Sequence, residues 1–150
     1  MPGGSPRHGA VFAQDLARDL SELGSSQSQL FGGTGFDAGL LQAEKPVAAF
    51  VDIAGFFENA AKLTGNDMLG FQRGQTRETR RSGLLFYVGH TAPTVMGMLR
   101  NTARYRRVFS DAVEIDVSTL ERDGVAKWYF SVPASVERRQ IVEFGISGIH

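Results

Sequence analysis

The stretch 93–133, PTVMGMLRNTARYRRVFSDAVEIDVSTLERDGVAKWYFSVP, contains the two patterns that decide the fold. Apolar residues recur at helical spacing over 95–109, and the proline and threonine before them are typical of a helix start. Further on, apolar and polar residues alternate on both sides of Asp123-Gly124, a pair that favours a β-hairpin. The stretch therefore predicts a helix followed by two antiparallel strands.

The two predicted strands each carry an apolar face. Side chains two residues apart lie on the same side of a strand, so the alternation places the apolar ones together. We expect this side of the hairpin to pack on the core and the charged side to meet solvent. The apolar positions are Val113, Ile115, Val117, Ala126, Trp128, Phe130 and Val132.

Three of the four arginines in 99–110 form the polar side of the predicted helix. At about 100° per residue, Arg100, Arg104 and Arg107 lie opposite the apolar side chains, where solvent contact explains them. Lys and Arg together number 16, equal to Asp and Glu, so the formal net charge is zero. A protein that binds nucleic acid with its own surface usually carries a basic excess. We therefore expect no DNA binding of physiological strength through these arginines.

Arg106 departs from that pattern because it falls near the centre of the apolar stripe. Its stem could pack on the core while its guanidinium reaches solvent, or it could pair with Glu114 or Asp116. It could also face a pocket and bind an anionic group through two parallel hydrogen bonds. The three interpretations stay open, and the last makes Arg106 a candidate ligand-binding residue.

The N-terminal half is predicted to be helical. Apolar residues recur at helical spacing over 10–23 and over 52–65, where Asp52 is the expected N-cap and Gly65 the expected stop. Combined with the helix and hairpin of the C-terminal half, this gives an α+β fold. Shorter helical segments are expected at 29–31, 37–42 and 82–88. The last is expected to be mostly buried, and a strand is the alternative there because its apolar run is short.

Three segments are expected to lie outside the regular pattern. Residues 1–9, MPGGSPRHG, are rich in glycine and proline and predict a disordered leader, which leaves 10–150 as one domain. The charged run TRETRR at 76–81 predicts an exposed loop that includes Arg77. In 135–150 an apolar helical pattern reaches the last residue without a stop signal, which predicts a truncated final helix.

The sequence offers little for catalysis or metal binding. It has no cysteine, so disulfides, thiolate metal sites and cysteine nucleophiles are excluded. His8, His90 and His150 lack the paired spacing of a metal site, so neither an enzyme nor a metal or cofactor site is expected. The alternative is a free-standing sensor or enzyme, for instance a haem-type sensor with His90 as iron ligand. No apolar run approaches the roughly 18 residues of a membrane span, which favours a cytoplasmic protein with no membrane partner.

An apolar cavity is the expected kind of small-molecule site. The aromatic residues of the hairpin and of 82–88 are core residues first, but a domain with eleven phenylalanines can enclose a cavity. A cationic or aromatic side chain at its wall would orient a ligand. The candidates for ligand binding are Arg106, Tyr87, Phe86, Trp128 and His90.

The order of these features resembles the N-terminal effector-binding region of AraC-type transcriptional regulators, in the subfamily with a largely helical sensor domain. Upstream, GFDAGLLQ at 35–42 and FFENAAKLTGNDMLGF at 56–71 are similar to the short helix and the longer helix with its turn in that family. Each motif is degenerate, and their shared order over about 10–145 carries the resemblance. The matching positions downstream are Gly83, Pro93, Thr94, Leu99, Ala103, Arg104, Tyr105 and the turn 121–124.

The resemblance implies a small-molecule-sensing regulatory domain that forms a homodimer. It also implies control of promoter DNA binding by a C-terminal helix-turn-helix domain, which these 150 residues lack. It names neither the effector nor the ligand residues. Two positions depart from the family pattern: Gly97 stands where an acidic residue completes a capping box, and Phe86 where a small residue is common. Packing near the cavity is therefore expected to differ.

Overall fold

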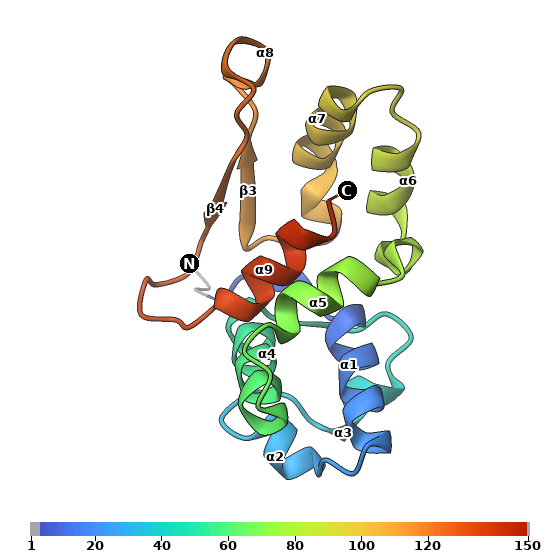
Figure 1. The fold of residues 1–150 in the computed structure, drawn as a ribbon, viewed down its shortest axis with the longest axis vertical. Coiled ribbons are helices and arrows are strands. Elements are labelled where there is room, and N and C mark those ends of the chain that lie inside the picture. The colour runs from blue at the N-terminus through green and yellow to red at the C-terminus, as the bar shows by residue number, and fades with distance from the viewer. Residues whose placement is uncertain (1–3, 150) are drawn as a thin grey trace.

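The computed structural model describes residues 4–149, which form a lower lobe and an upper lobe with two helices crossing between them (Figure 1). The lower lobe consists of α1 (Val11–Glu22), α2 (Gln27–Phe31), α3 (Ala38–Gln42) and α4 (Phe50–Thr64). The crossing helices are α5 (Leu69–Thr76) and α9 (Arg139–Ser147). The upper lobe consists of η1 (Thr79–Ser82), α6 (Leu84–His90), α7 (Val95–Tyr105), η2 (Arg106–Val108), β3 (Val113–Asp116), α8 (Leu120–Asp123) and β4 (Lys127–Phe130). The α+β prediction is confirmed.

Helix α4 lies at the centre of the lower lobe. Phe56 and Phe57 have no exposed surface, and their rings meet edge to face with centroids 5.9 Å apart. The predicted stop is confirmed, because Gly65 ends α4 in the left-handed conformation that glycine adopts without strain. The predicted N-cap is wrong. The helix begins at Phe50, and the carboxylate of Asp52 accepts a hydrogen bond of 2.8 Å from the Gly35 amide instead.

The prediction of a disordered leader is wrong for Arg7–Gly9, which form strand β1 antiparallel to β2 (Val47–Ala49). The amide of Gly9 also donates to the carbonyl of Phe109 at 2.7 Å, and Asp111 donates to Arg7 at 2.8 Å. The strand thus lies between the lower lobe and the start of the hairpin, which anchors His8 in the middle of the molecule. Residues 1–3 of the predicted leader lie outside the described residues.

The hairpin β3–β4 is confirmed, with Ile115 opposite Trp128 and Val113 opposite Phe130. Those four side chains share the face that turns toward the helices, while Glu114 and Tyr129, which lie between them, are exposed. The turn differs from the expectation. Gly124 ends the one-turn helix α8 in the left-handed conformation, so the glycine stops a helix rather than forming a two-residue hairpin loop.

Two glycines allow α5 and α9 to cross at backbone contact. A Cβ at Gly70 would lie 2.0 Å from the Gln140 carbonyl oxygen, and one at Gly74 would lie 2.4 Å from the Phe144 carbonyl oxygen. The buried amide of Gln140 completes the contact, because its Oε1 accepts from the Gly70 backbone at 2.7 Å. The close crossing fixes α9, which ends at Ser147 with Gly148 as its C-cap residue, against the base of the upper lobe.

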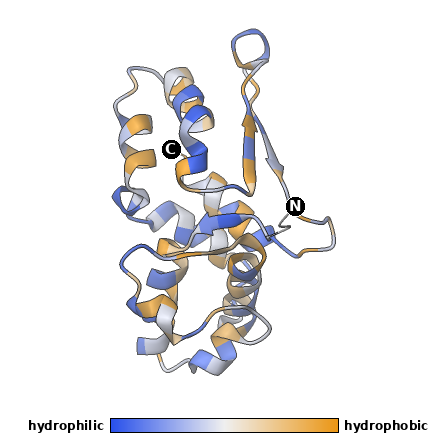
Figure 2. Ribbon diagram, turned by 180° about the vertical axis from the view of Figure 1, so that it is seen from behind, coloured by the Kyte–Doolittle hydropathy of each residue, from blue (hydrophilic) through white to orange (hydrophobic). Residues whose placement is uncertain are grey.

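The upper lobe is apolar but not enclosed. Helix α7 begins at the predicted place, where the hydroxyl of Thr94 accepts from the Gly97 amide at 3.0 Å, yet none of its residues is buried. Helix α6 is confirmed as a helix, but its expected burial is wrong, since Leu84 is 54% and Tyr87 59% exposed. Figure 2 shows hydrophobic segments in both lobes. No helix within residues 4–149 is both long and apolar enough to cross a bilayer.

Candidate functional site

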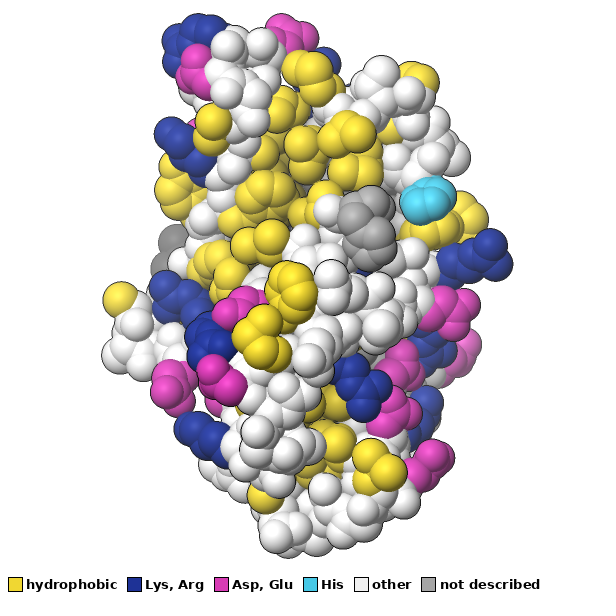
Figure 3. All heavy atoms as spheres, viewed as in Figure 1, with side chains coloured by type: hydrophobic (Ala, Val, Ile, Leu, Met, Phe, Trp, Pro, Cys, Tyr) yellow, Lys and Arg dark blue, Asp and Glu magenta, His cyan; other side chains and the backbone are white. Residues whose placement is uncertain are grey.

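A cavity of about 410 Å³ lies where the two lobes and the crossing helices meet. Figure 3 shows hydrophobic side chains gathered in the upper half of the molecule on the face seen there, whereas charged side chains lie at the top end and lower down. The walls come from β1, α1 and α4 below, from α5 and α9 at one side, and from α6, α7 and the hairpin above. Its volume falls within the range of ligand pockets in proteins, roughly 300–1,000 Å³.

The lining is mostly hydrophobic and contains cations but no described acidic residue. Two arginines, Arg77 and Arg106, and two histidines, His8 and His90, belong to it. The neutral polar side chains of the lining are those of Gln75, Thr79, Ser82, Thr102 and Ser110. Most of the remaining wall is aliphatic or aromatic, including Phe12, Leu85, Phe86, Met98, Leu99, Ile115, Trp128, Phe144 and Ile146. Such a wall favours a ligand with a large apolar surface.

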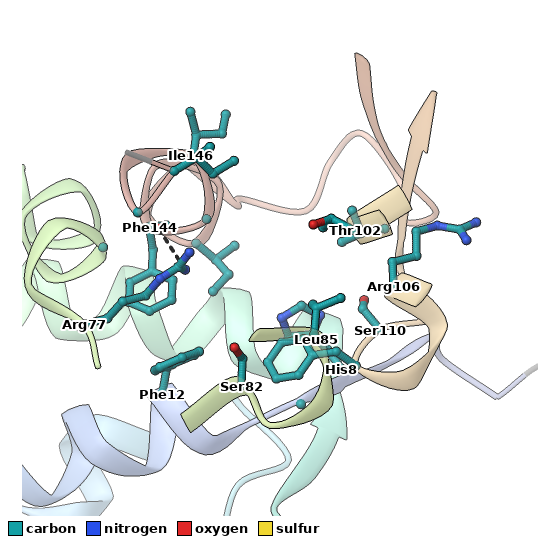
Figure 4. A pocket seen from close by; sticks show the side chains of 18 of the residues that line it. His8, Phe12, Arg77, Ser82, Leu85, Thr102, Arg106, Ser110, Phe144 and Ile146 are labelled. Carbon is teal, nitrogen blue, oxygen red and sulfur yellow. Dashed lines mark hydrogen bonds between the residues drawn. The ribbon is translucent and has the colours of Figure 1, made fainter. Parts of the chain in front are cut away.

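Arg77 enters the cavity from the segment that follows α5 (Figure 4). Its guanidinium carbon lies 4.9 Å from the ring centroid of Phe144 and 5.5 Å from that of Phe12, which are cation–π distances. Nη1 donates to the Phe144 carbonyl at 3.3 Å, whereas the buried Nε has no hydrogen-bond partner. Burial lowers the pKa of the Arg77 guanidinium from its ordinary value.

Arg77 also lacks a counter-charge. It forms no ion pair with an acidic side chain among residues 4–149, although each of the nearby arginines Arg73 and Arg81 pairs with an aspartate of α1. Arg77 is half-buried, and removing an unpaired cation from water is costly, so proteins normally pair such a group. The cavity therefore contains one cationic group that a ligand anion could neutralise.

His8 contributes an uncharged polar group to the same cavity. The residue is half-buried, but its Nδ1 is fully buried and makes no hydrogen bond within the described chain. Its ring meets Phe109 and Phe50 edge-on, with centroid distances of 4.9 and 5.4 Å. Burial lowers the pKa of His8 to about 4, so the imidazole is neutral at neutral pH. A neutral imidazole donates one hydrogen bond and accepts another.

Of the three interpretations of Arg106, the structure shows the ion pair. Its Nη2 lies 3.5 Å from Oε1 of Glu114 on β3, and Nη1 donates to the Ala103 carbonyl at 3.5 Å. The side chain is 15% exposed, so its stem lines the cavity. Its guanidinium points away from the other labelled side chains of Figure 4. The charge of Arg106 is thus balanced by protein.

The other candidate residues divide into three that line the cavity and one that does not. Phe86, His90 and Trp128 belong to the wall, and the His90 ring stacks on Phe86 with centroids 4.3 Å apart. Tyr87 points elsewhere on α6 and is not part of the lining. The three arginines on the opposite side of α7 and η2 are exposed as predicted. Among residues 4–149, no group of histidines and carboxylates has the arrangement of a metal site.

Sequence reasoning missed Arg77 and His8, because both lie in segments that were expected to be exposed. A signal for Arg77 does exist. Gly70, Gly74 and Arg77 are spaced i, i+4, i+7, so a helix through 69–76 places them on one side, facing α9. No comparable signal exists for His8, since a three-residue strand is too short to show an alternating pattern.

The family described as the N-terminal arabinose-binding domain of AraC transcription regulators matches residues 24–150. The chain belongs to this family. The resemblance seen in the sequence is therefore confirmed, and the domain is a ligand-sensing regulatory domain of the AraC type. No curated protein matches the chain.

Proposed function

We propose that the cavity between the two lobes binds the small-molecule effector of an AraC-type regulator. We further propose that effector binding controls DNA binding by a C-terminal helix-turn-helix domain. The observation that carries this proposal is the cavity of about 410 Å³ in a ligand-sensing domain. Homodimer formation stays a prediction from the family resemblance.

The position of the cavity suggests how a ligand would act. Its walls come from both lobes, so a bound molecule contacts helices that otherwise share little buried surface. A ligand that buries the half-exposed side chains of α6 and α7 favours conformations in which these helices lie close to α9. Differential affinity of about 1–3 kcal/mol between two conformations changes the binding of a coupled partner by about 5- to 150-fold.

The first test concerns the gene. Its coding sequence after residue 150 is expected to encode two helix-turn-helix motifs. If this region encodes no DNA-binding domain, the proposed control of DNA binding fails.

The second test fills the cavity in the full-length regulator. Thr102→Phe on α7 places a ring in the cavity, where Thr102 points, and Arg104→Phe places the same ring on the exposed side of the helix. Fluorescence anisotropy with operator DNA measures the affinity of each variant. We expect Thr102→Phe to change the affinity at least about 5-fold and Arg104→Phe to stay within about twofold. Equal affinities for both variants and the wild type would overturn the proposal.

A further inference from the structure

The balance of charge in the cavity indicates the charge of its ligand. Two arginines and no described acidic side chain line it. Glu114 compensates Arg106 at 3.5 Å, which leaves Arg77 as the uncompensated cation. A ligand with a cationic group would add a second unpaired charge beside Arg77. A ligand with one anionic group would instead form the ion pair that the protein does not supply.

The rest of the wall indicates what the ligand carries besides that charge. Arg77 lies at the lower end of the cavity, against Phe12 of α1 and Phe144 of α9. The walls contributed by α6, α7 and the hairpin are mostly apolar, with Leu85, Met98 and Trp128 among them, although His90 and Thr102 also line this part. If the anionic group of a ligand binds Arg77, the rest of the ligand therefore lies mainly among hydrophobic side chains. Removing an apolar body from water favours binding.

A sugar fits this wall poorly, because every hydroxyl of a pentose needs a hydrogen-bond partner once it is removed from water. The neutral polar side chains of the lining are scattered over α5, η1, α7 and the segment after η2, among a majority of aliphatic and aromatic ones. Carboxylates are missing from the described lining. The descriptive name of the family thus does not identify the effector of this chain.

We propose that the effector is an amphiphile with one carboxylate and an extended apolar body, and that Arg77 binds the carboxylate. This inference rests on the proposed function, because it assigns a ligand class to the same cavity. Nη2 of Arg77 makes no hydrogen bond to any residue of the described chain, so it can donate to a carboxylate oxygen. We assign the carboxylate to Nη2 and not to Nε, because Nε has almost no accessible surface. His8 lines the same cavity as a neutral imidazole.

Trp128 provides the measurement, because it is the single tryptophan of the chain and lines the cavity. We would titrate the 150-residue chain with decanoate, below the concentration at which it forms micelles, and follow the Trp128 fluorescence. Decan-1-ol carries the same apolar body without the charge, decyltrimethylammonium carries the opposite charge, and arabinose tests the sugar. We expect decanoate to bind about 10- to 100-fold more tightly than decan-1-ol, as one charge-assisted contact would give, and arabinose to leave the fluorescence unchanged.

Two substitutions test which arginine binds the carboxylate of decanoate. Arg77→Gln should reduce the affinity for decanoate about 10- to 100-fold and leave that for decan-1-ol unchanged. Arg80→Gln is the matched control, since Arg80 is exposed, lies three residues further along the chain and is not part of the cavity lining, and it should stay within about twofold. If Arg77→Gln does not fold, Gly148→Ala replaces it. Its Cβ would come within 2.5 Å of the guanidinium, so it displaces the group and should also weaken decanoate binding.

The outcomes separate the ligand class from the proposed function. Binding of decan-1-ol or decyltrimethylammonium as tightly as decanoate would overturn the carboxylate proposal and leave the cavity as the effector site. Equal loss of decanoate affinity in Arg77→Gln and Arg80→Gln would overturn the role of Arg77. Failure of the Thr102→Phe test on DNA affinity, with decanoate binding intact, would overturn the proposed function instead.

Discussion

The two lobes differ in how far their hydrophobic side chains are buried. In the lower lobe, Phe56 and Phe57 have no exposed surface, and rings from α2 and α4 meet one another. In the upper lobe, α7 has no buried residue, and Leu84 and Tyr87 of α6 are more than half exposed. Both lobes are rich in apolar residues, so composition does not explain the difference. The upper lobe lacks a layer to pack against, and the cavity occupies the place where that layer would lie.

This difference in burial indicates which helices a bound molecule would stabilise. The lower lobe obtains its hydrophobic stabilisation from its own side chains. Ile115 and Leu120 of the upper lobe are buried, but the exposed side chains of α6 and α7 gain burial only when something enters the cavity. A bound molecule should therefore stabilise α6 and α7 more than α4.

The largest expected effect on stability comes from removing a buried ring from the core of the lower lobe. Phe56→Ala removes a fully buried ring that contacts Phe31, Phe36 and Phe57, and should lower the free energy of unfolding by about 3–5 kcal/mol. The matched change in the upper lobe, Met98→Ala, removes a half-buried side chain and should cost roughly 1 kcal/mol. Urea denaturation measures both. Equal losses would mean that the lobes do not differ as described.

Acidification should weaken the junction between the lobes. The pKa of His8 is about 4 in the folded chain and about 6.5 in the unfolded chain, so the unfolded chain binds more protons between these values. The stabilising contribution is therefore complete above pH 6.5. It is lost as the pH falls to 4, by about 3 kcal/mol in total. His8→Phe should remove this part of the pH dependence in thermal unfolding, whereas His90→Phe should retain it. An unchanged profile for His8→Phe would contradict the burial of this imidazole.

The crossing of α5 and α9 should tolerate no side chain at its glycines. In Gly74→Ala the new Cβ meets the Phe144 carbonyl oxygen at 2.4 Å, and overpacking of this kind costs about 1–3 kcal/mol. Gly55→Ala on α4 is the control, because its Cβ meets only a methyl group of Thr34, at 3.4 Å. There the helix propensity of alanine should leave stability unchanged or raise it slightly. A neutral Gly74→Ala would show that the helices separate readily.

The smallest effect is expected on the outer side of α7. Arg100 pairs with Glu121 on the surface, and exposed ion pairs contribute about 0–1 kcal/mol. Arg100→Ala should therefore change the midpoint of thermal unfolding very little and leave ligand affinity unaltered. A strong effect on ligand binding would place this side of the helix in the site.

The long helices and the hairpin could be predicted because their patterns repeat. Apolar spacing indicated α1, α4 and α7, and alternation placed Ile115 and Trp128 on one face of the hairpin. The strands β1 and β2 could not be predicted, since each has three residues and one lies in a glycine- and proline-rich segment. The exposure of α6 could not be predicted from the sequence either, because an apolar pattern does not show whether another layer of the protein covers the helix.

The candidate site was predictable only in part, for a physical reason. Residues whose positions follow from a periodic element, such as Phe86 and Trp128, could be placed near the hairpin and the helices. Arg77 lies in a charged run whose neighbours Arg80 and Arg81 are exposed, and composition alone does not separate it from them. Its burial depends on the close approach of α9, a tertiary contact that the two glycines of α5 make possible.

Hydrogen exchange at individual amides tests the central claim most directly, because it compares the two lobes in one experiment. In the free chain, amides of α6 and α7 should exchange through local opening at a low free energy, whereas those of α4 should require global unfolding. Saturating decanoate should raise the protection of α6 and α7 well beyond any rise in α4. Equal protection of both lobes in the free chain, together with an equal rise on adding decanoate, would contradict the account.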